Sequence, residues 1–429
     1  MIVEVLLYGK TIGTAEWSDD RGTSIFQYST EALERGIEPS PIVMPTQGRT
    51  FETNRDHINF NNLPYLLSDS MPDDFGNIMM KEWLRQKNIS IQDINPVDRL
   101  TYVGTRGMGA LEYKPINHKE DSQYNVNIGE LLEVAKKVLE DKEDTLYNDL
   151  DKESLSNILR IGTSVGGARA KALIAIKMDN SGKIKEIKPG DIIQPEGYSY
   201  WLIKIDGANK HTLGEGDGLG KIEYAYYLLA KEAGINMSES ILHEENDRFH
   251  FLTKRFDRTD KGGKIHMQTF GALAGIDFKI PKASSYEDLF RVMRRLYIPY
   301  DQREQQYRRA LFNVVARNHD DHVKNFSFLM NDKGKWQISP AYDITFQYKE
   351  GGIWTNDHQS SINGKFNDFT RDDLLTLGES NSIKKANDIL DQIIAAVSSW
   401  SRIAKELDIP KNRIQYIEKN LRISNFNKN

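Results

Sequence analysis

The chain has 429 residues, of which 39% are hydrophobic and 28% charged, and its formal net charge is -5. This length predicts two or three domains, and the negative balance argues against strong nucleic-acid binding by the chain itself. Cysteine is absent, which excludes disulfides, thiolate catalysis and cysteine-ligated metal sites. The start is too short and too alternating for a signal peptide, and no apolar run approaches the ~18 residues of a membrane span. We therefore expect a cytoplasmic protein without membrane contact.

The first quarter of the chain predicts a small β-rich module. Short strands separated by Gly and Asp turns are expected at residues 3–8, 11–17 and 23–28. A helix follows, because apolar residues recur with a period of about 3.6 from Phe75 to Leu84. Gly104, Gly107 and Gly109 mark a loop. The polar stretch 114–126 is the best linker candidate, and an amphipathic helix is expected at 128–139.

A second β-rich block begins near Arg160. Residues 161–177 predict a glycine turn between strands, and two more strands are expected within 197–206 and 247–258. A helix at 221–233 ends before Gly234, a suitable C-cap. From about 266 the pattern turns helical, with two short strands, FSFLM and KWQIS, joined by a turn at 331–334. Helices are expected at 285–297, 301–317 and 381–406.

Residues 318–325, NHDDHVKN, place charged and imidazole side chains on a loop between a helix and a strand. In a phosphotransferase, an Asp such as Asp320 accepts the proton of the attacking hydroxyl, and an Asn shortly after it, here Asn325, binds magnesium. Asp343, set among apolar residues, could supply the second hard oxygen ligand. A helix-capping cluster with solvated charges explains the same loop. A metal hydrolase is a weaker alternative, because consecutive side chains diverge and no outlying ligand is evident; it would use His319, Asp320, Asp321 and His322.

Two further motifs could bind phosphate groups. Residues 163–171, TSVGGARAK, contain paired glycines that let amide N–H groups face a phosphate, although a plain hairpin turn explains them too. Lys204 lies inside an apolar strand and could reach a nucleotide, or it could be an edge-strand lysine that prevents aggregation. Glu223 could pair with Lys204 or favour a helix N-terminus. The run 214–220 looks like a dinucleotide fingerprint, but it lacks a βαβ context and carries two acids, so we expect a flexible loop.

The order of these motifs resembles the HipA-type serine/threonine kinases, toxins of bacterial toxin–antitoxin pairs, over nearly the whole chain. TSVGGARAK resembles the phosphate loop of that family, YWLIKID its ATP-lysine strand and LTKRFDR its lobe connector. NHDDHVKNFSF resembles the catalytic loop, AYDITF the metal-binding segment, and LPYLLSDSMPDDFG the helical part of the N-terminal subdomain. The resemblance implies an α+β, two-lobe protein-kinase-like fold, with a small β subdomain in a β-rich N-terminal part and an all-helical C-terminal lobe. The implied domains are an N-terminal subdomain at 1–125, a kinase N-lobe at 126–257 and a C-lobe at 258–429.

The resemblance also implies the activity and its residues. It implies an ATP- and Mg²⁺-dependent serine/threonine protein kinase, a toxin that phosphorylates a translation-related protein such as an aminoacyl-tRNA synthetase. Asp320 would be the catalytic base, Asn325 and Asp343 the metal ligands, and Ser164 the autophosphorylated residue. The implied ATP contacts, some through main chain only, are Val165, Gly166, Gly167, Ala168, Arg169, Ala170, Lys171, Lys204, Lys254, Arg255, Phe256, His322, Lys324, Asn325 and Asp343.

The implied partner is a HipB-like DNA-binding antitoxin. DNA would be reached only through that antitoxin, because the chain lacks an evident basic helix-turn-helix. Two residues depart from the family pattern: His319 replaces the common Thr before the catalytic Asp, and Lys254 stands where an acid is frequent. The second should matter little for a main-chain contact, whereas the first could alter substrate preference or activity. A small-molecule kinase and a catalytically weak co-repressor module stay open as alternatives.

Overall fold

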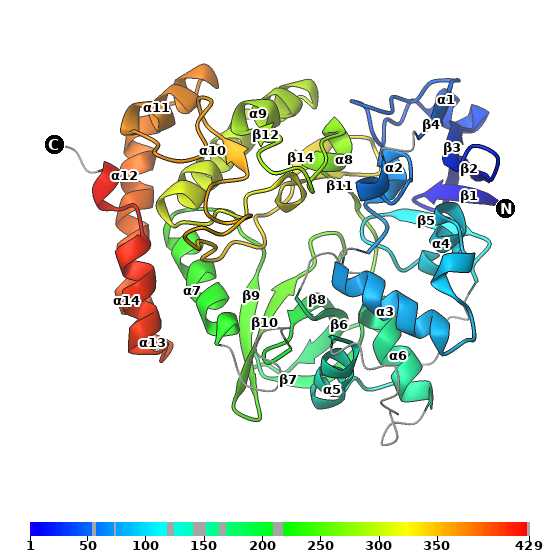
Figure 1. Cartoon of the computed structure of the whole chain (residues 1–429), viewed down its shortest axis with the longest axis horizontal. Helices are drawn as coiled ribbons and strands as arrows, with labels where there is room; N and C mark the ends of the chain where they lie inside the picture. The colour runs from blue at the N-terminus through cyan, green and yellow to red at the C-terminus, as the bar shows by residue number, and fades with distance from the viewer. Residues whose placement is uncertain are drawn as a thin grey trace.

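The computed structural model has two β-rich parts followed by a largely helical part (Figure 1). It describes residues 1–53, 57–72, 74–117, 124–139, 152–162, 169–208 and 218–426. Strands dominate the first parts and helices the last, so the α+β order expected from the sequence is confirmed. Among the described residues, no helix combines the length and the apolar character needed to cross a membrane.

The N-terminal part is built on a five-stranded antiparallel sheet with strand order β4-β3-β2-β1-β5. Its strands form because side chains alternate between two faces: Val3, Val5 and Leu7 of β1 are all fully buried. The three expected strands and the expected helix near 75–84 are confirmed. The elements of this part are β1 Ile2–Leu7, β2 Lys10–Ser18, β3 Thr23–Tyr28, α1 Thr30–Arg35, β4 Thr50–Glu52, α2 Tyr65–Ser68, α3 Asp74–Arg85, α4 Pro96–Val103 and β5 Leu111–Lys114.

A second five-stranded antiparallel sheet, in the order β7-β6-β8-β10-β9, forms the middle of the chain. Strand β8, which carries Lys204, lies at its centre. The edge-strand interpretation of Lys204 is therefore wrong. The elements here are α5 Ile128–Leu139, α6 Lys152–Gly162, β6 Lys171–Met178, β7 Ile184–Pro189, β8 Ser199–Lys204, α7 Leu219–Glu232, β9 Ser240–Glu245 and β10 Arg248–Lys254.

The start of this block differs from the expectation. Residues 161–162 end helix α6, so the glycine turn is not preceded by a strand. The helix is favoured because Leu155, Ile158 and Leu159 recur at helical spacing and are all buried. The described residues on the two sides of the stretch 163–168 are therefore a helix, α6, and a strand, β6.

The C-terminal part is mainly helical. FSFLM and KWQIS pair as β13 Ser327–Met330 and β14 Trp336–Ile338, as expected, and β11 His266–Thr269 adds a third strand. Strands β12 Ser284–Ser285 and β15 Ser360–Ser361 form a parallel pair. The lobe is helical but not strictly all-helical, because these short pairings frame the loop 318–325. Its helices are α8 Phe270–Ala274, α9 Tyr286–Arg295, α10 Tyr300–Val315, α11 Arg371–Ser380, α12 Ala386–Val397, α13 Trp400–Glu406 and α14 Lys411–Asn420.

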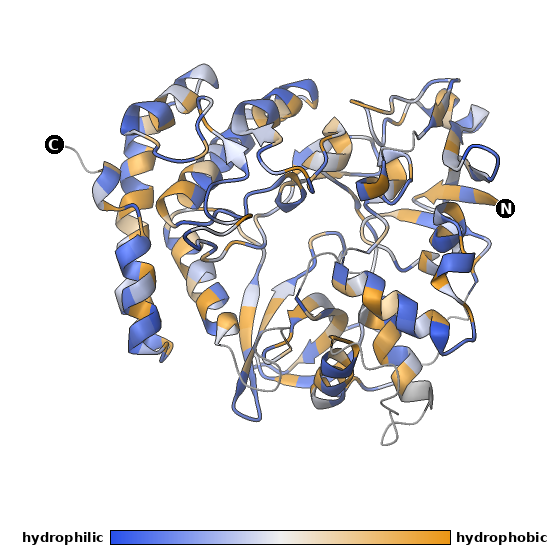
Figure 2. Cartoon of the chain, viewed as in Figure 1, coloured by the Kyte–Doolittle hydropathy of each residue, from blue (hydrophilic) through white to orange (hydrophobic). Residues whose placement is uncertain are grey.

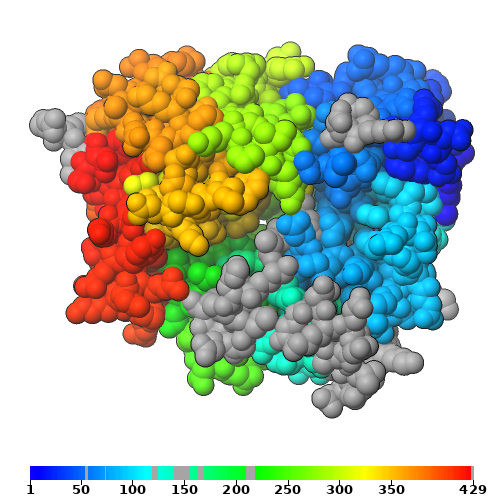
Figure 3. All heavy atoms as spheres, in the orientation of Figure 1, coloured from blue at the N-terminus to red at the C-terminus, as the bar shows by residue number. Residues whose placement is uncertain are grey.

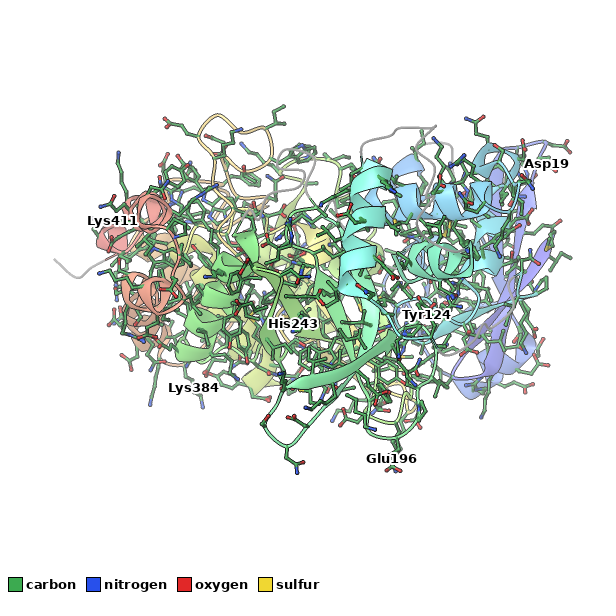
Figure 4. The ribbon with its side chains drawn as sticks, turned by 90° about the horizontal axis from the view of Figure 1, so that it is seen from below. Asp19, Tyr124, Glu196, His243, Lys384 and Lys411 are labelled. Atoms are coloured by element: carbon green, nitrogen blue, oxygen red, sulfur yellow. The ribbon has the colours of Figure 1, made fainter. Side chains whose placement is uncertain are left out.

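One continuous hydrophobic core runs through all three parts. The apolar segments lie mainly on the inner sides of helices and on the strands (Figure 2). Tyr8, directly after β1, donates its hydroxyl to the Met330 carbonyl and accepts the His266 N–H at 2.9 Å, which joins the first part directly to the last. Figure 4 shows Asp19 and Lys411 at opposite ends of the molecule, with His243 of β9 between them. The domain boundaries at 125 and 257 stay predictions.

Candidate active site

Two lysines lie opposite each other at one end of the central sheet. Lys171 begins β6, Lys204 ends β8, and the antiparallel register pairs these two residues. Both are buried. The Lys204 ammonium contacts the carboxylate of Glu223 on α7 and that of Asp343 in the C-terminal part. Glu223 therefore pairs with the lysine, which settles the choice left open by the sequence.

The charges of this cluster shift one another's pKa values. Burial lowers the pKa of Lys171, to about 8. Burial also lowers the pKa of Lys204, but Asp343 and Glu223 outweigh this effect and raise it. Burial raises the pKa of Asp343, yet Lys204 and Lys171 more than offset it and hold that pKa well below its usual range. At neutral pH Lys204 is therefore a cation and Asp343 an anion, the two charges that a phosphate and a metal ion require.

The loop 318–325 places alternate side chains on opposite sides. Asp320 and His322 are partly exposed, whereas His319 and Asp321 are buried. His322 Nδ1 accepts the Lys324 N–H at 3.2 Å, so the ring proton belongs on Nε2, which lies 3.7 Å from an Asp320 carboxylate oxygen. The loop thus separates two partly exposed side chains from two buried ones that anchor it.

Asp320 is the candidate base of this loop. Enclosure by the protein raises its pKa; His322 opposes that effect, and Asp343 and Asp321 add to it. Asp343 and Asp320 are therefore close enough to repel each other. A carboxylate whose pKa is raised takes up a proton more readily than an ordinary one, which suits a general base.

The buried half of the loop is an anchor. Asp321 accepts hydrogen bonds from the Tyr286 hydroxyl at 2.8 Å, from His358 Nδ1 at 2.9 Å and from the Gln359 N–H at 2.7 Å. Burial raises its pKa, to about 7, and the hydrogen bonds from the Tyr286 hydroxyl and from main-chain N–H groups oppose the rise. The His319 ring lies 4.1 Å from the His358 ring. Burial lowers the pKa of His319, so that residue is a neutral packing group.

This division of the loop counts against the metal hydrolase. His319 and Asp321 point into the core, away from Asp320 and His322. Within the part of the chain that the structure describes, no group of three or more His, Asp or Glu side chains could hold a metal ion. The capping interpretation holds for His322 alone, which caps the short turn η3 Val323–Asn325.

The expected connector leads from β10 into the C-terminal part. The Lys254 N–H donates to the Glu239 carbonyl at 2.7 Å, and the Arg255 N–H donates to the Tyr200 carbonyl at 2.8 Å. No hydrogen bond of the Phe256 main chain occurs among the described residues. Its ring lies 5.3 Å from that of Tyr342, next to Asp343. Among the described residues, the main-chain N–H and carbonyl of Phe256 therefore have no hydrogen-bond partner.

Part of the expected phosphate loop cannot be placed: Ser164, Val165, Gly166, Gly167 and Ala168 lie outside the described residues. Arg169 follows them and reaches Glu223, with 3.1 Å between Nη1 and Oε2. Ala170 is buried and its carbonyl accepts the Ile205 N–H at 3.0 Å. Lys324, from the catalytic side, lies over the Phe278 ring, with its Nζ 4.1 Å from the centroid. The sequence-predicted residues that are described therefore come from both lobes.

Two of these residues fit a magnesium ion. Asn325 donates its amide N–H to the Asp320 carbonyl at 2.6 Å, which leaves the amide oxygen as a ligand. Asp343 has a φ of 53°, a left-handed backbone that Asp tolerates better than most residues, and its side chain is 35% exposed. Both supply hard oxygen atoms, and magnesium usually takes few ligands from a protein. The donor set therefore fits magnesium bound jointly with a nucleotide.

The family assignment follows from domain comparisons. The model of the HipA N-terminal domain matches residues 3–114, and that of the HipA-like C-terminal domain matches residues 163–401. The chain belongs to the HipA family. HipA of Shewanella oneidensis MR-1, solved with HipB and its operator DNA, shares the fold, with a TM-score of 0.66 and 16% identity over 97% of this chain and 94% of that one. The two-lobe fold is thereby confirmed.

Two curated relatives match only part of this chain. "Putative kinase Y4dM" of Sinorhizobium fredii is 29% identical over 216 residues, which are 46% of this chain and 48% of that protein. A "Putative kinase" of Haemophilus influenzae is 21% identical over 299 residues, or 61% of this chain and 80% of the relative. The chain thus spans about half the length of the Sinorhizobium protein.

The sequence analysis did not predict the hydrogen-bond partners of the buried Asp321. Tyr286 and His358 lie 35 and 37 positions from Asp321. Nothing in their local sequence marks them as its hydrogen-bond partners. One signal was available: Asp321 stands between two residues with proposed roles, and a carboxylate buried beside a catalytic loop needs donors.

Proposed function

We propose that this HipA-family protein is an ATP- and Mg²⁺-dependent serine/threonine protein kinase. The observation that carries the proposal is the contact of Lys204 with Glu223 and Asp343, beside the Asp320–Asn325 loop. This contact brings a lysine from a sheet, an acid from a helix and an acid from the other lobe to one point. Phosphoryl transfer needs this combination of charge neutralisation and positioning.

Each residue then has a distinct task. Lys204, Lys171 and Arg169 would neutralise the phosphates of ATP, and Asn325 and Asp343 would hold magnesium. The bound magnesium would offset charge on the phosphate oxygens. A hydroxyl oxygen of the substrate attacks the γ-phosphorus, the bond to the ADP oxygen breaks, and Asp320 accepts the hydroxyl proton. His322 would orient Asp320, since its ring nitrogen lies 3.7 Å from the carboxylate.

The connector 254–256 would hold the adenine. The Lys254 carbonyl accepts the Ser238 hydroxyl and keeps one lone pair, and the Phe256 N–H is available among the described residues. Contacts of this kind use main-chain groups, so the Lys254 side chain, which pairs with Asp260 at 3.1 Å, is not required.

We further propose that the protein is a toxin whose activity is regulated by autophosphorylation. The family assignment supports a HipB-like DNA-binding antitoxin as partner, with DNA reached through it, because the Shewanella HipA was solved in such a complex. The substrate would be a translation-related protein, of which an aminoacyl-tRNA synthetase is one class. Ser164 would be the autophosphorylated residue.

An assay with γ-labelled ATP and Mg²⁺ tests the activity. Label on the protein itself or on an added protein supports the kinase. Label on a metabolite instead would favour a small-molecule kinase, and no transfer at all would favour a co-repressor module that acts with the antitoxin. The same assay without Mg²⁺ is the matched control.

A further inference from the structure

An exposed loop follows Asp343, and both ends of this exposed loop are hydrogen-bonded to the catalytic loop. At its start, the Gln347 N–H donates to the Arg317 carbonyl at 3.0 Å, and the His319 N–H donates to the Gln347 carbonyl at 3.2 Å. At its end, the Gln359 N–H and the Ser360 hydroxyl donate to Asp321, at 2.7 Å and 2.8 Å. The loop 348–357 is therefore fixed to the two neighbours of Asp320.

The loop is ordered by its own hydrogen bonds. The Gly352 N–H donates to the Lys349 carbonyl at 2.9 Å, and the Asn356 N–H donates to the Gly352 carbonyl at 3.1 Å. The Asn356 carbonyl lies 3.1 Å from His319 Nδ1. Its apex is therefore held in position relative to the catalytic loop.

That apex is apolar and exposed. Ile353 is 84% exposed and Trp354 44% exposed. The gold spheres of this part of the chain lie on the face in view in Figure 3. Exposing an isoleucine beside a tryptophan has no benefit for the fold, because the same side chains would be stabilised by burial.

A second loop, residues 276–283, adds to this surface. Its Phe278 packs against the catalytic loop, where the centroids of the Phe278 and His322 rings lie 6.1 Å apart. Its Ile280 is 57% exposed. Lys282 pairs with Asp357 at 2.7 Å and so joins this loop to the first. We call Ile280, Ile353 and Trp354 the apolar rim.

We propose that the apolar rim binds the protein substrate, through an aliphatic or aromatic side chain close in sequence to the accepting Ser or Thr. This inference rests on the proposed kinase function. A substrate must present its hydroxyl to Asp320 while its neighbouring residues pass over the adjacent surface, and the rim is fixed to the residues on either side of Asp320. A partner bound here is therefore within reach of the catalytic base, which favours the substrate over the antitoxin or a second copy of the chain.

A degenerate peptide library centred on Ser or Thr, with one fixed residue per flanking position, tests the rim. We expect the wild type to prefer an aliphatic or aromatic residue at one position. The double variant Ile353→Ser/Trp354→Ser should raise KM for the best peptide about tenfold or more, with kcat nearly unchanged, because burial of such side chains contributes binding common to ground and transition states. The matched control is Ile2→Ser, which changes an isoleucine of similar exposure, 62%, in the N-terminal sheet.

Several outcomes would overturn the inference. An unchanged KM and an unchanged preference in the double variant would remove the rim from substrate binding. Loss of antitoxin binding, or a change of oligomeric state by light scattering, with KM unchanged would assign the rim to those partners instead. If the wild type labels itself but no peptide, only the proposed role of the rim is refuted. If the wild type transfers no phosphate at all, the proposed kinase activity is refuted as well. Unchanged ATP affinity by calorimetry shows that the variant is folded.

Discussion

At the scale of single residues, Asp343 combines an uncommon backbone with an uncommon charge state. Its φ is 53°, its carboxylate contacts Lys204, and the two lysines Lys204 and Lys171 keep it ionised. Backbone conformations of this kind cost energy and persist where the surroundings impose them, frequently at functional sites. Asp343 is therefore kept as an anion in a fixed position.

Replacement of Asp343 by Ala should weaken binding of Mg·ATP much more than binding of metal-free ATP. In the proposed site the carboxylate would act on the nucleotide through the metal, whereas Lys204 and Lys171 would act on the phosphates directly. Calorimetry with and without Mg²⁺ measures both affinities. Equal losses under the two conditions would show that Asp343 holds no metal.

Phosphorylation of Ser164 should lower ATP affinity. A phosphate adds about two negative charges, and it would compete with ATP for the cations Arg169 and Lys171, which follow Ser164 closely in the sequence. Mass spectrometry after incubation with Mg·ATP should find the phosphate on Ser164, and an ATP titration of the modified protein should show the weaker binding. A modified protein with full ATP affinity would refute the predicted loss of affinity, and an unmodified Ser164 would refute the site. Ser164→Ala is the control.

At the scale of elements, helix α7 sets the position of Glu223. Its Gly220 packs against β10, where a Cβ would lie 2.0 Å from the Phe249 carbonyl oxygen. Only glycine permits this approach. The run 214–220, expected to be a flexible loop, therefore ends in a residue with a packing role, and its first four residues lie outside the described part of the chain.

Gly220→Ala should destabilise the protein by about 1–3 kcal/mol, because a backbone oxygen cannot give way to the added methyl group. It should also weaken ATP binding, since α7 must move and take Glu223 away from Lys204. Thermal unfolding and calorimetry measure the two effects. Gly129→Ala in α5 is the control, where the nearest atom is the flexible Asn127 side-chain oxygen at 3.1 Å; equal stability losses in both variants would contradict the packing argument.

Local patterns in the sequence predicted most of these elements. Alternation revealed β1 to β3, and helical spacing revealed α3, α5, α9 and α10, because both depend on neighbouring residues. The position of β8 within its sheet was not predictable, since strand order depends on pairings between distant segments. Lys204 could therefore be read as an edge residue until its neighbours β6 and β10 were known. The contacts of Asp321 with Tyr286 and His358 were missed for the same reason.

At the scale of the whole molecule, one buried carboxylate ties the connector to the N-terminal part. Asp257 accepts from Arg255 Nε at 2.9 Å, from Arg258 Nη1 at 2.8 Å and from the Gly109 N–H at 2.8 Å. Arg258 also donates to the Gly107 carbonyl at 2.8 Å. The glycine loop seen in the sequence thus serves to bring main-chain groups to this ion cluster.

Asp257→Asn should destabilise the folded state by about 3–5 kcal/mol, because it leaves two buried arginines without their anion. Chemical denaturation would measure the loss. The control is Glu52→Gln, which breaks the exposed pair with Arg21 and should cost only about 0–1 kcal/mol. Similar losses for the two variants would mean that the cluster does not hold the parts together.

The central claim is that Asp320 receives the proton of a hydroxyl during transfer from ATP. The most direct test is single-turnover transfer of labelled phosphate by the Asp320→Asn variant, with ATP affinity measured on the same sample. The account predicts a rate lower by about 10²–10⁴-fold, because that is the usual contribution of a general base, and an ATP affinity close to that of the wild type. A variant that transfers phosphate within a factor of a few of the wild-type rate would contradict the account.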